Sequence, residues 1–154
     1  QTGKKFFPYV IEPAAGVDRA ALAFIVDAFE EISTNDQRPT TNERAEGEFV
    51  LHLHPKLAPI KVAVFPLVKK EKLPEVARNI YEELKKRYFV AYDEAGSVGR
   101  RYRRQDEIGT PWCVTVDFDS IKDNTVTLRD RDTMKQERVK ISDLDRVIDK
   151  KLNS

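Results

Sequence analysis

A short basic cluster at residues 100–104 contains the side chains best suited to bind a polyanion. A guanidinium group keeps its charge at any physiological pH, grips phosphate oxygens through paired hydrogen bonds and stacks on flat rings. Proteins bind unpaired RNA loops with such planes, and lysine and arginine contact the backbone phosphates. The four candidates are Arg100, Arg101, Arg103 and Arg104, with Tyr102 between them. The alternative is a solvated basic face that pairs with Asp106 and Glu107.

Two further basic pairs stand next to predicted strands. Arg129 and Arg131 lie at a predicted hairpin, where neighbouring aspartates dilute their charge. Lys69 and Lys70 come just after a predicted central strand, at the strand ends where open α/β sheets tend to bind ligands. Both pairs are candidates for RNA contact, and an ordinary charged loop is the alternative for the lysines.

Charge is distributed unevenly along the 154 residues. The first 50 residues have 5 Lys/Arg and 9 Asp/Glu, a net charge of −4, and the remaining 104 have 22 and 17, a net charge of +5. This asymmetry is a mild indication of a polyanionic partner for the second part. No apolar run approaches the length that spans a membrane, and no signal peptide is recognisable.

Several side chains that could bind a metal or take part in catalysis are better explained by a structural role. His52 and His54 alternate along an extended segment without a clear acidic third ligand, so we expect no metal site. Cys113 is the single cysteine, and its apolar surroundings favour an inert buried thiol in a reducing, cytoplasmic compartment. We expect Ser97 to cap a helix and Trp112 to pack in the core.

The first 33 residues predict a strand–helix pair without partners elsewhere in the chain. Residues 6–11 predict a buried strand, and residues 20–32 predict a helix that is apolar on most faces, as in a helix packed inside a larger body. We therefore expect 1–33 to be the end of one domain, 34–57 to be a linker and 58–154 to form a second domain.

The second domain has the pattern of an α/β fold. Strands are predicted at 60–67, 88–93, 112–118, 125–130 and 137–141. Helices are predicted at 73–84, at 98–108 and after Ser142, with a turn at 122–124. Strands that alternate with helices imply parallel pairing, and the closing hairpin adds antiparallel strands. The fold class is a mixed five-stranded sheet with three helices.

Two segments resemble class II aminoacyl-tRNA synthetases. Residues 8–31, PYVIEPAAGVDRAALAFIVDAFEE, are similar to motif 3 in its glycyl form. Residues 54–86 and 93–117 resemble the anticodon-binding domain shared by glycyl, histidyl, prolyl and threonyl enzymes. The resemblance covers most of the chain in the family's order, and the IEPxxGVDR run favours the glycyl branch. It implies a C-terminal piece of such an enzyme, which ligates glycine to its tRNA.

The resemblance also implies roles for individual residues. Arg19 would contact the ATP γ-phosphate, Gly16 would let the backbone approach the nucleotide, and Glu12 would receive the ammonium group of glycine. Without the resemblance, the better interpretation of Arg19 at a helix start and of Glu12 at a strand end is that both are surface charges. Ala14 stands where many relatives have serine. Motifs 1 and 2 are missing, so this chain should not activate glycine by itself, and ATP with Mg²⁺ would serve only the full-length enzyme.

The implied partners are the anticodon arm of tRNA and, in the full-length enzyme, a second copy in a homodimer. We expect neither DNA nor membrane binding. Two other functions remain open: an accessory or interaction protein that reuses the fold, and a small α/β enzyme or ligand-binding domain. The second lacks a glycine-rich phosphate loop, because FPLVKKEK follows its first strand.

Overall fold

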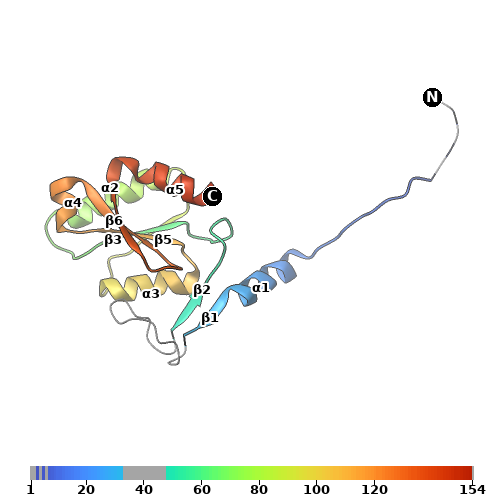
Figure 1. The fold of residues 1–154 in the computed structure, drawn as a ribbon, viewed down its shortest axis with the longest axis horizontal. Helices are drawn as coiled ribbons and strands as arrows, with labels where there is room; N and C mark the ends of the chain where they lie inside the picture. The colour runs from blue at the N-terminus through green and yellow to red at the C-terminus, as the bar shows by residue number, and fades with distance from the viewer. Residues whose placement is uncertain (1–2, 4, 6, 33–47, 154) are drawn as a thin grey trace.

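The computed structural model describes residues 3, 5, 7–32 and 48–153, which form an α/β domain and an N-terminal arm (Figure 1). The arm contains α1 (Val17–Ala28) and β1 (Phe29–Glu31). β1 pairs antiparallel with β2 (Phe49–Leu51), which leads into the domain. The α/β fold class expected from the sequence is confirmed.

A five-stranded mixed sheet forms the centre of the domain. Its strands are β3 (Val62–Pro66), β4 (Val90–Tyr92), β5 (Trp112–Val116), β6 (Thr125–Asp130) and β7 (Gln136–Lys140). Their order is β4-β3-β5-β6-β7. β3 runs parallel to β4 and β5, and β5-β6 and β6-β7 are antiparallel. The loops after β3 and β4 therefore leave the sheet at the same edge.

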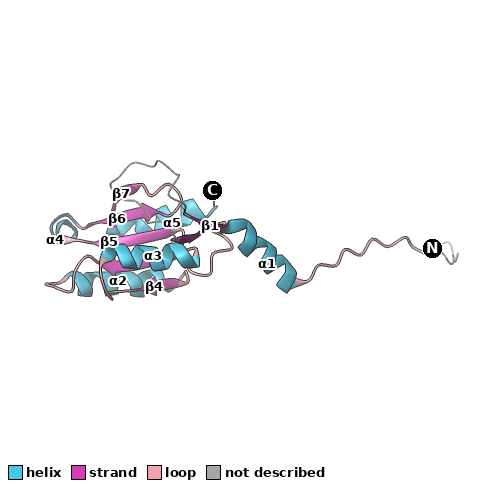
Figure 2. Cartoon of the chain, turned by 90° about the horizontal axis from the view of Figure 1, so that it is seen from below, coloured by secondary structure: helices cyan, strands magenta, loops and turns pink. Residues whose placement is uncertain are grey.

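Helices cover both faces of this sheet. α2 (Leu73–Leu84) and α5 (Leu144–Asn153) lie on one face, and α3 (Val98–Ile108) lies on the other (Figures 1 and 2). The larger core, which includes Val62, Val114 and Leu128, faces α2 and α5. A smaller cluster of Ala63, Phe65 and Cys113 faces α3. Trp112 is buried in the larger core, as expected.

Both ends of α3 follow the prediction. Ser97 caps the helix, because its Oγ accepts a hydrogen bond from the Arg100 amide at 3.4 Å. Gly109 ends it in the left-handed conformation, with φ of 80°. A Cβ atom at Gly109 would stand 3.0 Å from the Leu51 carbonyl oxygen, so glycine is also needed where β2 passes the helix.

Three local predictions in the second domain need correction. Residues 118–123, expected as a strand end and a turn, form helix α4 (Phe118–Asp123). Asp117 caps this helix and forms a capping box with Ser120, a signal that the strand pattern concealed. Ser142 lies inside a 3-10 turn (Ile141–Asp143) that leads into α5, so it is not the helix cap.

The arm also differs from its prediction. Residues 7–11 form no strand, and Phe7, Tyr9 and Ile11 are fully exposed, because no strand of the described residues pairs with them. α1 ends at Ala28, and the last predicted helical residues form β1 because they pair with β2. The predicted loop at 33–47 lies outside the described residues.

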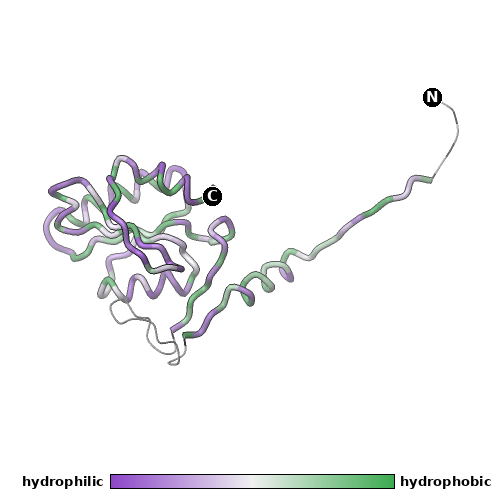
Figure 3. The backbone as a smooth tube through the Cα atoms, in the orientation of Figure 1, coloured by the Kyte–Doolittle hydropathy of each residue, from purple (hydrophilic) through white to green (hydrophobic). Residues whose placement is uncertain are grey.

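Apolar side chains remain exposed along α1, which Figure 3 shows as a largely hydrophobic segment. Val17, Leu22, Phe24, Ile25 and Val26 are each about half exposed or more. This agrees with a helix that needs a larger body to cover it. Within the described part of the chain, no helix is long and apolar enough to cross a membrane.

Candidate RNA-binding surface

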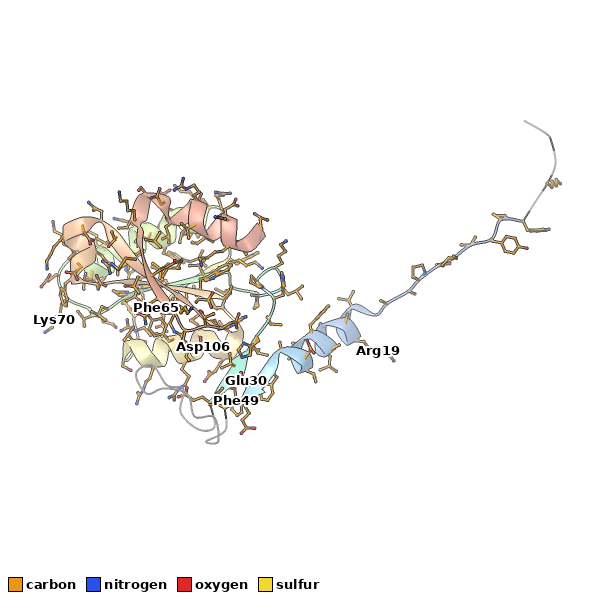
Figure 4. All side chains as sticks on the ribbon, viewed as in Figure 1. Arg19, Glu30, Phe49, Phe65, Lys70 and Asp106 are labelled. Carbon is orange, nitrogen blue, oxygen red and sulfur yellow. The ribbon has the colours of Figure 1, made fainter. Side chains whose placement is uncertain are left out.

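The loops after β3 and β4 bring basic side chains to one edge of the sheet. We define the strand-end surface by Lys69, Lys70, Arg78, Tyr92, Glu94, Arg100 and Arg104. Lys69 and Lys70 are exposed in the β3–α2 loop, and Figure 4 shows Lys70 at the side of the domain away from the arm. This edge is where an open α/β sheet places its ligands.

Sequence reasoning missed three members of this surface. Glu94 lies 3.8 Å from the Lys69 ammonium group and 3.5 Å from Arg78, and it accepts a 2.7 Å hydrogen bond from the Tyr92 hydroxyl. The Arg78 guanidinium stacks 5.0 Å from the centre of the Tyr92 ring. Burial, followed by the bond to Glu94, raises the pKa of Tyr92 to about 12. Arg78 could have been found on the polar face of the predicted helix.

Arg100 and Arg104 lie on the exposed flank of α3. Arg100 has no ion-pair partner among the residues that the structure describes. Arg104 is held by Asp93 through Nε at 2.9 Å and donates a 2.8 Å hydrogen bond to the Ala95 carbonyl. Burial alone would raise the pKa of Asp93, but hydrogen bonds from the Ala95 amide and Arg104 bring it below its ordinary value.

The other two arginines of the cluster point elsewhere. Arg101 is only 3% exposed, and its guanidinium donates to the carbonyl oxygens of Pro66 and Gly96. Arg103 forms an ion pair with Glu48, on the side of α3 that faces the chain entering β2. The four guanidiniums therefore do not share one face, because successive helix positions point in different directions.

Arg129 occupies the interior instead of the hairpin surface. It is 5% exposed and forms two hydrogen bonds, of 2.9 and 3.0 Å, with the Asp106 carboxylate. Its guanidinium also lies 4.8 Å from the centre of the Tyr102 ring. Burial lowers the pKa of Arg129, but the bonds to Asp106 outweigh this and leave it raised. The geometry therefore does not support a direct RNA contact.

Arg131 is also buried, at 2% exposure. It donates to the carbonyl oxygens of Gly109 and Leu53, at 2.7 and 2.9 Å, and to the Asp132 carboxylate. These bonds connect the turn after β6 to the segment after β2 and to the C-terminal end of α3. The expected RNA contact of Arg131 is not supported either, because its guanidinium faces protein carbonyls.

The arm residues expected to bind substrates are all exposed. Glu12 lies in the extended segment, and Arg19 lies in the first turn of α1, where Figure 4 shows it outside the domain. Gly16 has φ of −77°, a conformation open to any residue, so its special freedom is not used. In the part of the chain that the structure describes, these three residues do not form an enclosed site that fits ATP.

His52 connects the arm to the domain. One ring nitrogen lies 2.6 Å from the Glu30 carboxylate of β1, and the other lies 2.7 Å from Asp132 in the β6–β7 turn. These two acidic partners lie 22 and 80 residues away, so no local pattern indicated them. The described residues contain no group of side chains that could hold a metal ion. Cys113 is buried as expected, and burial raises the pKa of its thiol.

Comparisons with known proteins agree with this fold. Residues 61–151 match the anticodon binding domain family. A glycine–tRNA ligase from Rhodopirellula baltica is 59% identical over 143 residues, which are 93% of this chain and 26% of that protein. A glycine–tRNA ligase from Caldanaerobacter subterraneus subsp. tengcongensis is 57% identical over 98% of this chain and 30% of its own length. The chain thus spans less than a third of these relatives.

The structural comparison gives the same architecture. A prolyl-tRNA synthetase from Cryptosporidium parvum superposes with a TM-score of 0.60 at 24% identity, over 67% of this chain and 23% of that one. At this identity the likeness concerns the fold alone. The resemblance to glycyl-tRNA synthetases seen in the sequence is confirmed by the relatives, and the family match covers more than half of the residues. The chain belongs to the family of anticodon-binding domains.

Proposed function

We propose that this chain binds the anticodon arm of a glycine tRNA as part of a glycine–tRNA ligase. The observation that carries the proposal is the strand-end surface on a domain of the anticodon-binding family. This surface combines exposed lysine and arginine side chains with Tyr92, on whose ring the Arg78 guanidinium stacks. Such groups bind single-stranded loops through phosphates and base stacking.

The structure narrows the set of proposed RNA-binding residues. Lys69, Lys70, Arg100 and Arg104 remain, and Arg78 joins them. Arg103 is a secondary candidate because its ion pair with Glu48 lies on the side of α3 that faces the chain entering β2. We propose structural roles for Arg101, Arg129 and Arg131, since each is buried and donates to protein oxygens.

The experiment is tRNA binding across a range of salt concentrations. Arg100→Ala should weaken binding and reduce the slope of log affinity against log salt by about 0.7, because one fewer phosphate is neutralised. Arg146→Ala is the matched control, since Arg146 is an exposed arginine on α5. Equal losses for both variants would leave only non-specific electrostatics and would contradict the proposed surface.

The arm belongs to the catalytic part in this proposal. Arg19 would contribute to ATP binding, Glu12 to glycine binding and Gly16 to the nucleotide site, but only with the rest of the ligase around them. We propose that the whole enzyme uses ATP with Mg²⁺, forms a homodimer and works in the cytoplasm. In this chain, residues 1–33 would be the end of the catalytic domain, residues 34–57 a linker and residues 58–154 the anticodon-binding domain. The chain alone should show no glycine-dependent ATP–pyrophosphate exchange; measurable exchange would refute this.

A further inference from the structure

A pocket of about 430 Å³ opens inside the strand-end surface, and no role has been given to it above. Leu67, Val68 and Lys69 of the β3–α2 loop form one wall. The opposite wall comes from Glu94 and from the start of α3, with Gly96, Ser97, Val98 and Arg101. Its size falls within the range of small-ligand sites. Because it lies between the loops after two parallel strands, it occupies the crevice that open sheets use for ligands.

Arg101 places a buried positive charge at this pocket. The residue is 3% exposed, and among the described residues its guanidinium forms no ion pair. Its terminal nitrogens donate to the Pro66 and Gly96 carbonyl oxygens, and its Nε is buried without a hydrogen-bond partner. A buried charge is stable only when an opposite charge or a full set of hydrogen bonds compensates it. The protein supplies part of this compensation, so an anion in the pocket would complete it.

The neighbouring carboxylates do not occupy the place beside Arg101 where an anion would bind. Asp93 acts on Arg101 through its charge, but it contacts Arg104 directly. Glu94 lines the pocket, yet Tyr92 and Arg78 donate to it and Lys69 lies 3.8 Å away. Both acids therefore have partners that hold them.

Two other groups add positive potential. The first turn of α3 has N–H groups without helical acceptors, and the Ser97 hydroxyl satisfies only that of Arg100. The partial positive charge of a helix N-terminus favours phosphate. Lys69 is 59% exposed in its side chain and lies 3.8 Å from Glu94, a long contact that leaves it able to turn to an incoming anion.

The remaining walls are apolar. Leu67, Val68 and Val98 are partly buried and line the pocket beside the charged groups. An inorganic ion would leave these walls in water, whereas a nucleotide would cover them with its sugar or base. We infer that this pocket binds one nucleotide of an unpaired RNA loop, with its phosphate at Arg101, Lys69 and the N-terminus of α3. The inference rests on the proposed function and assigns one subsite to it.

The test measures tRNA affinity and amide chemical shifts of the full 154-residue chain. Lys69→Ala should weaken tRNA binding about fivefold, the loss of one screened charge-assisted contact. Glu94→Gln should strengthen it about two- to threefold, because a negative charge leaves the pocket while the amide oxygen can still accept from Tyr92. Lys86→Ala is the control, since Lys86 is an exposed lysine that pairs with Glu83 at the far end of α2.

The ligand class is tested with uridine 5′-monophosphate, uridine and inorganic phosphate. The monophosphate should shift the amide signals of Gly96, Ser97, Val98 and Gly99 more strongly than phosphate does, uridine should shift them least, and tRNA should compete. Arg101→Lys, checked for folding by thermal unfolding, should reduce the shifts. Lys69→Ala remains informative if that variant unfolds.

Three results would overturn the inference. If tRNA binds but Lys69→Ala and Glu94→Gln behave like Lys86→Ala, the pocket is not a subsite, and the proposed function stands. If Glu94→Gln weakens binding, Glu94 itself contacts the ligand and the phosphate assignment is wrong. If the monophosphate binds but tRNA neither binds nor competes, both the subsite and the proposed function fail, and the pocket takes free nucleotides.

Discussion

Arg129 on β6 and Asp106 on α3 form a buried bidentate ion pair, with both bonds at or below 3.0 Å. The pair connects the helix to the face of the sheet that it covers, next to Tyr102, whose hydroxyl bonds Thr115 at 2.5 Å. Figure 4 shows Asp106 at this interface, with Phe65 close by. The helix that carries the basic cluster is thus oriented by a charge pair within the protein.

Removing one partner of this pair should destabilise the domain strongly. Asp106→Asn leaves the Arg129 charge buried without its counterion, and we expect a loss of about 3 to 5 kcal/mol in the free energy of unfolding. Urea denaturation measures it. Asp119→Asn is the matched control, because Asp119 is exposed and pairs with the exposed Lys122 in α4. A loss below about 1 kcal/mol for Asp106→Asn would contradict the structural role.

The bridge at His52 should hold the arm against the domain. His52→Ala removes both bonds, to Glu30 and to Asp132, so the amides of Phe29–Glu31 should exchange with deuterium faster. His54→Ala should leave exchange in β1 unchanged, because the His54 ring accepts a local hydrogen bond from the Lys56 amide, two residues away. Equal exchange in the two variants would show that the β1–β2 pairing holds the arm without the histidine.

Stability should fall in acid through Asp93 and Asp117. Burial raises the pKa of each carboxyl, but hydrogen bonds from Arg104 to Asp93, and from Arg138 and Ser120 to Asp117, lower it below the ordinary value. A folded pKa below the unfolded value of about 3.9 means that the unfolded chain binds protons first as the pH falls. The stabilisation is therefore present above about pH 4 and lost below it.

Urea unfolding at pH 6 and pH 3 measures this loss. Asp93→Asn should make the difference between the two pH values smaller, because the variant no longer has the carboxyl that titrates. An unchanged difference would assign the acid sensitivity to other groups.

Cys113 should resist thiol reagents in the folded protein. Its thiol is 1% exposed, and burial raises its pKa, so little thiolate is present at neutral pH. Reaction with an aromatic disulfide reagent should be slow in buffer and fast in urea. Fast labelling in buffer would mean that β5 opens readily, against its central place in the sheet.

The sequence predicted the elements whose pattern is local. Ser97 and Gly109 gave both ends of α3, because capping and left-handed residues act within one turn. The parallel and antiparallel pairing in the sheet followed from strands that alternate with helices and from the closing hairpin. The helix at 118–123 was missed because Phe118 extends the apolar pattern of the strand before it.

The surface was harder to predict than the fold. Adjacent arginines look alike in a sequence, but 100° of helical rotation separates Arg100, exposed, from Arg101, buried. The burial of Arg129 depends on Asp106, 23 residues earlier. Such long-range pairs leave no local signal, so only the structure distinguishes guanidiniums available to RNA from those engaged in the protein.

The most direct test of the central claim compares the affinity of this chain for a glycine tRNA and for the same tRNA with a substituted anticodon, at equal salt. Binding to the strand-end surface through the anticodon loop predicts a loss of about tenfold or more on substitution, since each base contact contributes about 1 to 3 kcal/mol. Lys69→Ala and Arg100→Ala should weaken binding of both tRNAs by similar factors, because these side chains are assigned to phosphate contacts. Equal affinity for the two tRNAs at every salt concentration would contradict anticodon recognition.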